Sequence, residues 1–395
     1  MRVEHLTLDD FRNYTQAEVG FSAGPNLIIG RNGQGKTNLV EAIGYFSTLS
    51  SHRVSTDAAL IRAGQPSAIA RMRVAVGSRD VLLELQLNRD RPNRAQLNRN
   101  AVRPRELSRW FSSVLFAPED LLLIRGEPGV RRRFLDEAIV ARTPSVAAVL
   151  ADYERVVRQR SALLKSLRGR HGGSANSALE VWDEQLIELG TRIILERRRF
   201  VEAMRHPLGL AYESIVQVDH RPQLDMVETL LGQRRDQVSR ETFDTLDPQL
   251  VSRETVAASF AAVIERVRRQ EVERGVTLIG PHRDDLLLTL HELPVKGYAS
   301  HGESWSFALA LKLALAELLR EESASGDPVI ILDDVFAELD TRRRAALMSE
   351  VGKFEQVIVT AAVEEDVPVG DWSTVRIDAG AVVSASSAGG GGTHA

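Results

Sequence analysis

The sequence predicts an α/β fold in which the first and last parts of the chain build one domain around a mostly helical second lobe. Three observations predict it: a glycine-rich loop at residues 30–37, a buried strand ending in two aspartates at residues 329–334, and helical periodicity through the middle third. The length of 395 residues allows two or three domains. With 43% hydrophobic and 26% charged residues, the composition is that of a globular protein with a sizeable core.

The composition also excludes several classes of protein. The chain has no cysteine, which rules out disulfides and zinc-thiolate sites and fits a reducing cytoplasm. We find no secretory signal at the start and no apolar run of about 18 residues, so we expect a cytoplasmic protein without membrane contact. The nine histidines show no metal-binding spacing. The formal net charge is −4, so any contact with DNA must come from a local basic patch.

The first part of the chain alternates between strand and helix patterns. Short strands are predicted around Leu6 and Leu8, around Val19 and Phe21, and through residues 69–87, where apolar residues alternate with polar ones. A compact apolar run over residues 26–29 is followed by a glycine-rich segment and then by helical spacing. The apolar positions of that helix are Leu39, Val40, Ile43 and Phe46.

The glycine-rich segment reads GRNGQGKT over residues 30–37 and matches the pattern G-x-x-x-x-G-K-[ST] in full. Its backbone N–H groups and the following helix N-terminus would hold phosphates. Lys36 would reach the β- and γ-phosphates, and Thr37 would bind Mg²⁺. We therefore expect ATP and Mg²⁺ to bind at Gly30, Arg31, Asn32, Gly33, Gln34, Gly35, Lys36, Thr37 and Asn38. The alternative is a chance glycine-rich turn.

A second phosphate-related motif lies near the other end of the chain. Residues 329–332 form a continuous apolar run, typical of a strand inside a parallel sheet, and Asp333 and Asp334 follow it. Ligands of open α/β sheets bind where strands end. Asp333 is expected to hold Mg²⁺, and Asp334 is the candidate general base for water attack. The alternative is an ordinary strand ending in a polar turn. Strands are also predicted at 276–279 and 285–289, and a helix at 304–320.

The middle third shows two seams of apolar residues at three- and four-residue spacing, over residues 146–167 and 179–200. A loop is expected between them at 168–177. This predicts a short antiparallel helical hairpin, with two amphipathic helices packed on a core as the alternative. We expect a head at 1–125 and 272–383, a helical insertion at 126–271, and a disordered Gly/Ser-rich tail at 384–395.

Arginines gather in the stretch 89–109. Seven arginines against Asp90 and Glu106 give a local charge of 7 − 2 = +5. Such a patch predicts salt-sensitive contact with phosphates of any DNA sequence; the alternative is a solvated face. The candidate DNA contacts are Arg89, Arg91, Arg94, Arg99, Arg103, Arg105, Arg109, Arg131, Arg132 and Arg133.

The two phosphate-related motifs lie about 300 residues apart, and further sequence blocks appear between and beside them in a recognisable order. These blocks are DFRNY at 10–14, SHR at 51–53, FAPEDL at 116–121, RRRFLD at 131–136, GPHRDDL at 280–286, YASHG at 298–302 and LDDVFAELD at 332–340. Together they resemble the ABC-type ATPases, within these the SMC-like group, and most closely the RecF family of bacterial recombinational-repair proteins. The resemblance extends over most of the chain.

The resemblance implies roles for residues that act on a second subunit. Ser300, with His301 and Gly302, stands where ABC-type proteins carry their signature sequence, so Ser300 would contact the γ-phosphate of ATP held by the partner in an ATP-dependent homodimer. Asp340 stands in the D-loop at the same interface. The signature departs from the usual pattern at His301 and Glu303. The second acid at the strand end is Asp334 in place of glutamate, which implies slow hydrolysis.

Two further positions of the ABC-type pattern are weakly matched. Glu119 stands where a glutamine is usual, and Thr360 where a histidine is usual. The resemblance also implies a function: an ATP-dependent DNA-binding protein and weak ATPase of recombinational repair and replication restart. It would bind single-stranded and duplex DNA at gapped or stalled sites and help load the recombinase with the mediator proteins RecR and RecO.

Three other functions remain to be weighed against this one. An ATP-gated protein scaffold with incidental hydrolysis fits the same residues. A transporter ATPase is disfavoured by the large insertion and the missing histidine. A chromosome organiser is disfavoured because each helical arm, of about 25 residues, would span only about 37 Å.

Overall fold

The computed structural model describes residues 1–168, 174–232, 252–323, 325–378 and 380–386. The chain divides into two compact units. The head unit comprises Met1–Leu121, Pro207–Asp219 and His301–Ala395, and the helical unit comprises Leu122–His206 and His220–Ser300. None of the helices in the described ranges has the length and apolarity needed to cross a membrane.

The head unit contains an antiparallel sheet with the strand order β2-β1-β4-β5-β6-β7. Its side chains alternate between buried and solvent-facing positions, and the buried ones include Leu6, Leu8 and Met72. This confirms the strands predicted in the first 90 residues. The bounds are β1 (Arg2–Phe11), β2 (Tyr14–Gly20), β4 (Ser67–Val76), β5 (Arg79–Asn88), β6 (Arg94–Leu97) and β7 (Asn100–Val102).

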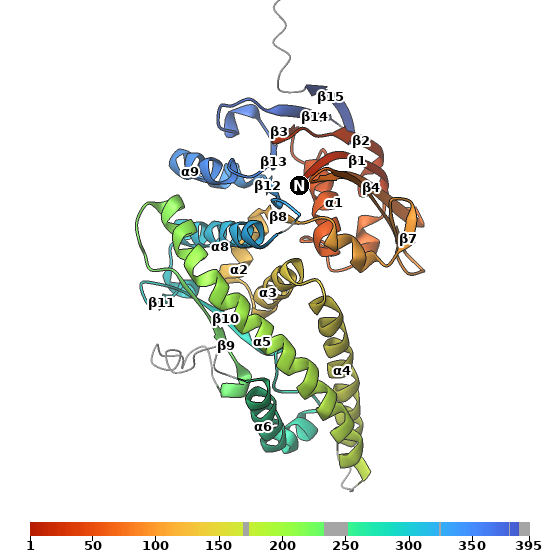
Figure 1. The fold of residues 1–395 in the computed structure, drawn as a ribbon, viewed down its shortest axis with the longest axis vertical. Helices are drawn as coiled ribbons and strands as arrows, with labels where there is room; N and C mark the ends of the chain where they lie inside the picture. The colour runs from red at the N-terminus through yellow and green to blue at the C-terminus, as the bar shows by residue number, and fades with distance from the viewer. Residues whose placement is uncertain (169–173, 233–251, 324, 379, 387–395) are drawn as a thin grey trace, which may run out of the picture. The chain divides into compact units, whose positions relative to one another are not determined.

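The second sheet of the head unit has the order β15-β14-β3-β13-β12-β8, and its strands from β14 to β8 are parallel (Figure 1). It joins β3 (Gly24–Ile29) and β8 (Ser113–Phe116) to β12 (Val329–Asp333), β13 (Gln356–Ala361), β14 (Ser373–Asp378) and β15 (Ala381–Ser386). All residues of β12 and β13 are buried. Strands from both ends of the chain therefore share one sheet, which brings the two phosphate-related motifs to the same edge.

The helices of the head unit are α1 (Lys36–Thr48), α8 (His301–Glu322) and α9 (Thr341–Val351), together with the last residues of α5. Short 3₁₀ turns lie at Asp57–Leu60, Pro104–Arg109, Pro118–Asp120, Val335–Glu338 and Glu364–Asp366. The predicted helix at 304–320 lies within α8, which confirms that prediction. Most of α8 is buried because apolar residues occupy nearly every side of it.

The helices of the helical unit are α2 (Leu121–Arg125), α3 (Pro128–Arg142), α4 (Val146–Leu167), most of α5 (Ser174–Val216), α6 (Arg253–Arg274) and the single turn α7 (Val295–Tyr298), with a 3₁₀ turn at Thr229–Leu231. A small sheet has the order β11-β10-β9, with β9 (Gln223–Val227), β10 (Asp285–Leu290) and β11 (Leu293–Pro294). The strand predicted at 285–289 lies within β10. The strand predicted at 276–279 is wrong, because these residues form bends, and their polar groups are held by side chains of the unit.

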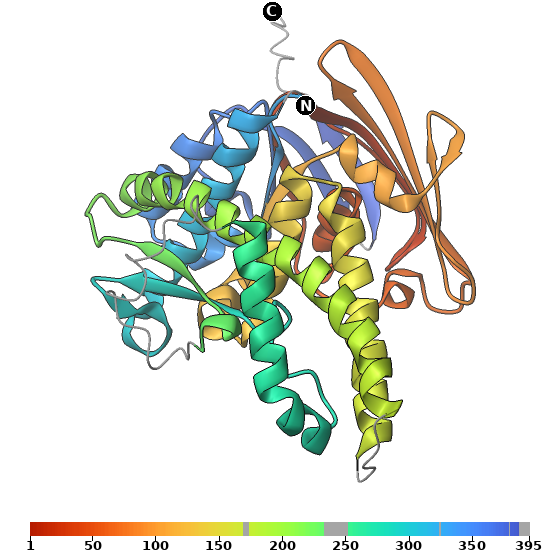
Figure 2. The ribbon, with the colours of Figure 1, turned by 60° about the horizontal axis from the view of Figure 1, so that its bottom comes forward.

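The predicted helical hairpin forms, and a third helix completes its packing. Figures 1 and 2 show α4 and α5 side by side with α6 against them. The shared core combines Tyr153 of α4 with Leu186 of α5 and Phe260 of α6. Gly190 of α5 allows a close approach, since a Cβ there would lie 2.5 Å from the Phe260 ring. The predicted hairpin of α4 and α5 is therefore present. Its packing on α6 also agrees with the alternative prediction of two amphipathic helices packed on a core.

Two predicted segment bounds differ from the structure. The expected loop at 168–177 is shorter, because α5 already begins at Ser174; residues 169–173 lie outside the described residues. The predicted disordered tail at 384–395 overlaps β15, which pairs with β14 up to Ser386. The remainder of that tail, 387–395, also lies outside the described residues.

Candidate functional site: a phosphate-binding face and its surroundings

The loop at residues 30–35 connects the end of β3 to the start of α1, as the motif requires. Gly33 and Gly35 have φ angles of 81° and 116°, which favour glycine. A Cβ at Gly35 would lie 2.6 Å from the Tyr14 hydroxyl, and one at Gly30 would lie 2.4 Å from the carbonyl oxygen of Ile377. A side chain at either glycine would collide with these neighbours, so both positions require glycine. The loop without side chains leaves its backbone N–H groups open to a phosphate.

Lys36, the first residue of α1, is buried, with a side chain only 3% exposed. Its Nζ donates to Oδ1 of Asn32 at 3.4 Å and lies 3.9 Å from Oδ1 of Asp334. The motif lysine and the second strand-end acid, about 300 residues apart in sequence, are therefore neighbours in the head unit.

The strand-end acids form one hydrogen-bonded group with two threonines. Asp333 Oδ1 accepts from the hydroxyls of Thr37 at 3.2 Å and Thr360 at 2.7 Å. The Thr360 hydroxyl also accepts from the backbone N–H of Asp334 at 2.9 Å. Thr360, where ABC-type proteins usually carry histidine, thus links both acids. The hydroxyl of Thr37 and the carboxylate of Asp333 are hard oxygen donors of the kind that Mg²⁺ prefers.

The pKa of Asp333 is raised to about 6, mainly by burial and also by the neighbouring charge of Asp334, while the hydrogen bonds from the two threonines oppose the shift. Glu119, in the turn Pro118–Asp120, also contributes a repulsive charge. Asp334 has a φ of 51°, so the chain turns sharply there. A divalent cation would relieve the repulsion among these carboxylates.

A buried carboxylate on α1, which we did not select from the sequence, is hydrogen-bonded to residues of the segments next to the phosphate-binding loop. Glu41 of α1 has a fully buried side chain and accepts from Arg12 through Nε at 2.8 Å and Nη2 at 2.6 Å. The Ser51 hydroxyl donates to it at 2.5 Å, and Arg53 Nη1 lies 3.8 Å away. One signal was present: Glu41 is the only charged residue among the apolar positions 39–43.

Hydrogen bonds continue from this carboxylate to the phosphate-binding loop. Arg53 donates to Oδ1 of Asn38 at 2.9 Å, and Asn38 donates to Oδ1 of Asn13 at 2.7 Å. Asn13 in turn donates to the carbonyl oxygen of Gln34 at 3.3 Å. The blocks 10–14 and 51–53, which carried the resemblance, therefore line the phosphate-binding loop.

Gly302 of the signature segment and Asp340 of the D-loop lie together in the head unit, and Ser300 is the last residue of the helical unit. A Cβ at Gly302 would lie 3.0 Å from Nη1 of Arg343, and that same nitrogen donates to Oδ2 of Asp340 at 3.2 Å. Asp340 also caps α9 by accepting from the N–H of Arg343 at 2.8 Å. Ser300 is exposed and immediately precedes α8, which begins at His301. Their roles toward a second subunit stay predictions.

Eight of the ten candidate DNA-binding arginines are exposed. Five are exposed on the edge of the antiparallel sheet and the adjoining 3₁₀ turn: Arg94, Arg99, Arg103, Arg105 and Arg109. Arg89 and Arg91 are also exposed but are held by neighbours, since Arg89 donates to backbone carbonyls and Arg91 to Asn88. Arg133 of α3 is exposed in the helical unit.

Arg131 corrects one of these predictions. Its side chain is fully buried, and its Nε and Nη2 donate to the two carboxylate oxygens of Asp285 at 2.7 and 2.9 Å. It therefore cannot reach a DNA phosphate. Arg132 is partly buried and donates to the backbone oxygen of Asp284 at 2.7 Å, so it too serves the fold. In the basic run 131–133 no residue type marks the face of α3 that points inward.

We expect Arg131→Ala to lower the free energy of unfolding by about 3–5 kcal/mol, because Asp285 would remain as a buried unpaired charge. Urea unfolding followed by circular dichroism measures this. The matched control is Arg133→Ala two residues away, which should change stability by less than about 0.5 kcal/mol. Equal stability of the two variants would contradict the structural role of Arg131.

The block 280–286 lies in a buried polar network of the helical unit. His282 accepts or donates a hydrogen bond with the Tyr153 hydroxyl at 2.8 Å, and burial lowers its pKa to about 4. Asp284 accepts from the N–H and the hydroxyl of Thr229, both at 2.8 Å. Arg197 donates to the Pro281 carbonyl at 2.6 Å. These contacts hold the loop in place, so the residues around His282 have a structural role.

Asp284 predicts a pH-dependent stability. Burial, with the charge of Glu228 next, raises its pKa from 3.8 to about 7. The folded state therefore keeps a proton that the unfolded state has already lost, and stability falls as pH rises from about 4 to about 7. Asp284→Asn should remove a fall of about 3 kcal/mol between pH 5 and pH 8. Urea unfolding at both pH values tests this, with the exposed Asp371→Asn as control; a parallel fall in Asp284→Asn would contradict it.

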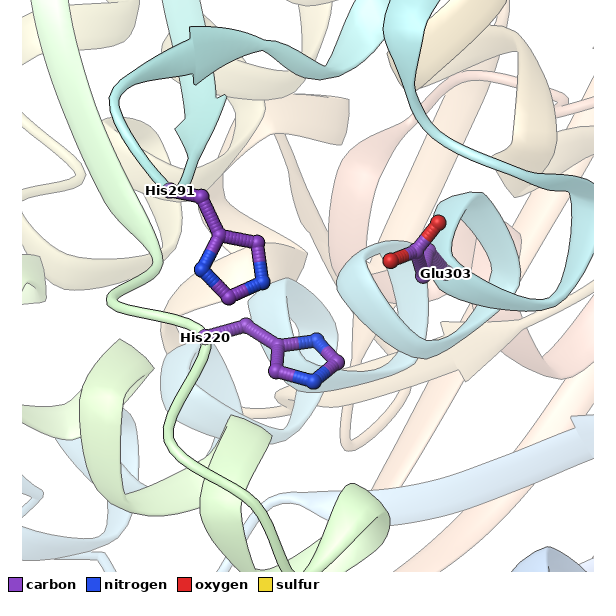
Figure 3. Close-up of side chains that lie close together, drawn as sticks. All are labelled: His220, His291 and Glu303. Atoms are coloured by element: carbon purple, nitrogen blue, oxygen red, sulfur yellow. The ribbon is translucent and has the colours of Figure 1, made fainter.

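Two histidines of the helical unit pack together beside the small sheet. Figure 3 shows the rings of His220 and His291, whose centroids lie 4.6 Å apart, and the N–H of His291 donates to the carbonyl oxygen of His220 at 2.9 Å. Glu303, drawn in the same view, belongs to α8 of the head unit. The histidine pair joins the end of β10 to the segment before β9.

Comparisons with known proteins identify the family. The family model for the RecF/RecN/SMC N-terminal domain matches residues 2–377. A "DNA replication and repair protein RecF" of Leifsonia xyli subsp. xyli is 55% identical over 388 residues, which cover 98% of this chain and 100% of that protein. This chain belongs to the RecF family. A RecF protein of Clavibacter michiganensis subsp. michiganensis is 53% identical, over 98% of this chain and 96% of its own length.

Solved structures agree with the RecF assignment. The structure of "the recombination mediator protein RecF-ATPrS in RecFOR pathway" has a TM-score of 0.83 and 27% identity, covering 96% of this chain and 97% of that one. The structure of an SmcHead bound to the C-winged helix domain of ScpA has a TM-score of 0.52 at 16% identity, covering 97% of this chain and 96% of that one, which shows the shared fold alone. The predicted fold class, an ABC-type head with a mostly helical second lobe, is confirmed, and RecF family membership places the chain in DNA replication and repair.

Proposed function

We propose that this RecF-family chain binds ATP and Mg²⁺ on its phosphate-binding face and uses them to pair with a second copy on DNA. The observation that carries the proposal is that Lys36 lies beside Asp334 and Thr37 donates to Asp333 in the head unit. Lys36 and the loop amides would hold the β- and γ-phosphates, and Thr37 with Asp333 would hold Mg²⁺. The RecF-ATPrS structure shows that a protein of this fold takes a nucleotide.

Hydrolysis is proposed to be slow and to release the dimer. Asp334 is the candidate base, and its carboxylate is 34% exposed and lies 3.9 Å from Nζ of Lys36. A general base must come within about 3 Å of the water it activates. The aspartate side chain is one methylene shorter than the glutamate usual in ABC-type proteins, so we propose a weak ATPase that serves DNA binding.

The proposed dimer would be completed by the signature and D-loop segments of a second copy. Ser300 stands exposed just before a 22-residue helix whose N-terminus carries a partial positive charge toward an anion. Gly302 and Asp340 meet the same arginine, Arg343, so the two segments share one part of the head unit. ATP bound on one chain would thus be enclosed by the other.

DNA is the proposed nucleic-acid partner, bound in single-stranded, duplex or gapped form. RecR and RecO are proposed as protein partners. Support for DNA comes from the repair role of the family and from the exposed arginines on the sheet edge. In particular, Arg99 sits exposed in the two-residue turn between β6 and β7, where its φ is 67°. An ATP-gated protein scaffold is the competing function.

The arginine edge can be tested by the salt dependence of DNA binding. In the double variant Arg99→Gln/Arg105→Gln we expect weaker binding and a salt slope shallower by about 2, since each phosphate contact contributes about 0.9. The control removes two exposed arginines from the helical unit, Arg158→Gln/Arg269→Gln, and so changes the net charge equally. If the salt slope falls equally in both variants, the arginine edge has no special role and only the net charge matters. If it falls in neither variant, the ATP-gated protein scaffold is favoured.

A further inference from the structure

A tight turn displays an aromatic side chain just before the signature segment. Residues 295–298 form a turn in which Lys296 has φ −66° and ψ 113° and Gly297 has φ 96° and ψ −16°. These are the angles of a type II β-turn, which requires glycine at its third position. Tyr298 follows that glycine and is 69% exposed.

The turn is held firmly on its inner side. Val295 is buried, and the N–H of Ala299 donates to its carbonyl oxygen at 3.1 Å. Lys296 Nζ donates to the Gly126 carbonyl at 3.0 Å and lies 3.8 Å from Glu127. The helical unit therefore fixes the backbone on both sides of Tyr298 while its ring stays in solvent. A ring presented on a fixed backbone loses little conformational entropy when it is covered.

Tyr298 differs from the other exposed apolar side chains. Among those in the described part of the chain, it is the one aromatic, and it shows no hydrogen bond, ion pair or ring contact with any other described residue. Tyrosine is enriched in the residues that dominate binding energy at protein interfaces, since it has a large apolar ring and a polar tip. Two residues of extended chain, about 7 Å, separate it from Ser300.

We propose that Tyr298 packs against the nucleotide-holding face of a second copy of this chain, beside the composite site that Ser300 of the same chain completes. The inference rests on the proposed ATP-dependent dimer and adds to it a residue that binds the partner. Because Ser300 must touch the partner's phosphates in that dimer, a ring about 7 Å away on the same exposed segment is brought to the partner's surface. The hydroxyl can then bond to a polar rim while the ring covers apolar surface.

The first experiment measures self-association by sedimentation velocity with ATP and Mg²⁺. Tyr298→Ala should weaken the dimer at least about tenfold, as truncating a central interface aromatic does. Tyr298→Phe should keep most of the affinity because the ring remains. Leu293→Ala, which removes another exposed apolar side chain of the same unit, is the control and should have no effect. Unchanged association of Tyr298→Ala would overturn the inference.

The second experiment determines which composite site Tyr298 serves. Chains carrying Lys36→Met and chains carrying Ser300→Arg, labelled with different fluorophores, are mixed with ATP, and their pairing is measured by energy transfer. This reference pair retains one complete site, made of the loop of the Ser300→Arg chain and Ser300 of the Lys36→Met chain. Tyr298→Ala is then added either to the Ser300→Arg chain or to the Lys36→Met chain.

The two arrangements contain the same three substitutions, so general loss of stability affects them alike. We expect pairing at the reference level when Tyr298→Ala is on the Ser300→Arg chain, and at least about tenfold weaker pairing when it is on the Lys36→Met chain. Equal losses in both arrangements, or losses that appear only when DNA is added, would contradict the inference. A reference pair that fails to form would contradict the proposed dimer itself.

Discussion

Lys36→Met is expected to abolish ATP-dependent dimerisation. The Lys36 ammonium is buried at the end of the phosphate-binding loop, 3.4 Å from Asn32 and 3.9 Å from Asp334. Methionine keeps the length and apolar volume of the side chain but removes the charge that would bind the β- and γ-phosphates. Removing one partner of a buried charge pair costs about 2–5 kcal/mol, or a loss in ATP affinity of about 30-fold or more.

Titration calorimetry with ATP and sedimentation velocity measure the two consequences separately. The control is Lys353→Met, which removes an exposed lysine of the same head unit and should leave both values unchanged. Because Asp334 loses its nearby cation, the variant's folding is checked by its thermal unfolding. Normal dimers of Lys36→Met with ATP would show that the loop does not control association.

Ser300→Arg is expected to leave ATP affinity within about twofold of the original and to eliminate the dimer. Ser300 is exposed and lies outside the loop that holds the phosphates of its own chain, so a longer side chain there need not disturb that loop. In the proposed dimer the arginine side chain would fill the space where Ser300 contacts the γ-phosphate of the partner's ATP. A misplaced side chain at an interface costs about 2 kcal/mol or more of binding free energy.

The same two measurements test this change, with Ser166→Arg as control. Ser166 lies exposed on α4 of the same helical unit, so the control adds an equal charge elsewhere. Lost ATP affinity in Ser300→Arg would place Ser300 in the site of its own chain. Dimers that form normally would remove the signature segment from the interface.

Much of the fold could be predicted because the local sequence patterns occur in the same residues that form the buried contacts of the structure. Residues 329–332 are apolar throughout, and the structure places their strand between two parallel strands. The loop motif is set by local sterics, since a side chain at Gly30 would collide with the backbone of Ile377 and one at Gly35 with the Tyr14 side chain. The pairing of Thr37 with Asp333 followed from the motif chemistry and needed no knowledge of the insertion.

What the sequence could not show depends on long-range pairing. Arg131 and Arg133 look alike in a basic run, yet only the first meets Asp285, 154 positions later, and becomes buried. Arg160 interrupts an apolar seam, and the structure pairs it with Asp183 and Glu271 at 2.6 Å each, so a polar break became a core ion-pair cluster. Residues 276–279 have a strand composition, but side chains rather than a neighbouring strand satisfy their backbone.

The helical insertion shows the same limit in a different way. Its two seams predicted a pair of helices, which form, but the partner α6 comes from residues 253–274, whose last turns are rich in charge. Only Phe260 and a few aliphatic residues mark its buried face. A weakly amphipathic helix of this kind is recognised by what it packs against more than by its own periodicity.

The measurement that tests the central claim most directly is fluorescence anisotropy of labelled gapped duplex DNA, with and without ATP and Mg²⁺, at two salt concentrations. We expect tight binding that requires ATP, weakens as salt rises, and is lost in Lys36→Met. Binding that is equal with and without ATP, or absent under every condition, would contradict an ATP-gated DNA-binding dimer and would favour a protein scaffold.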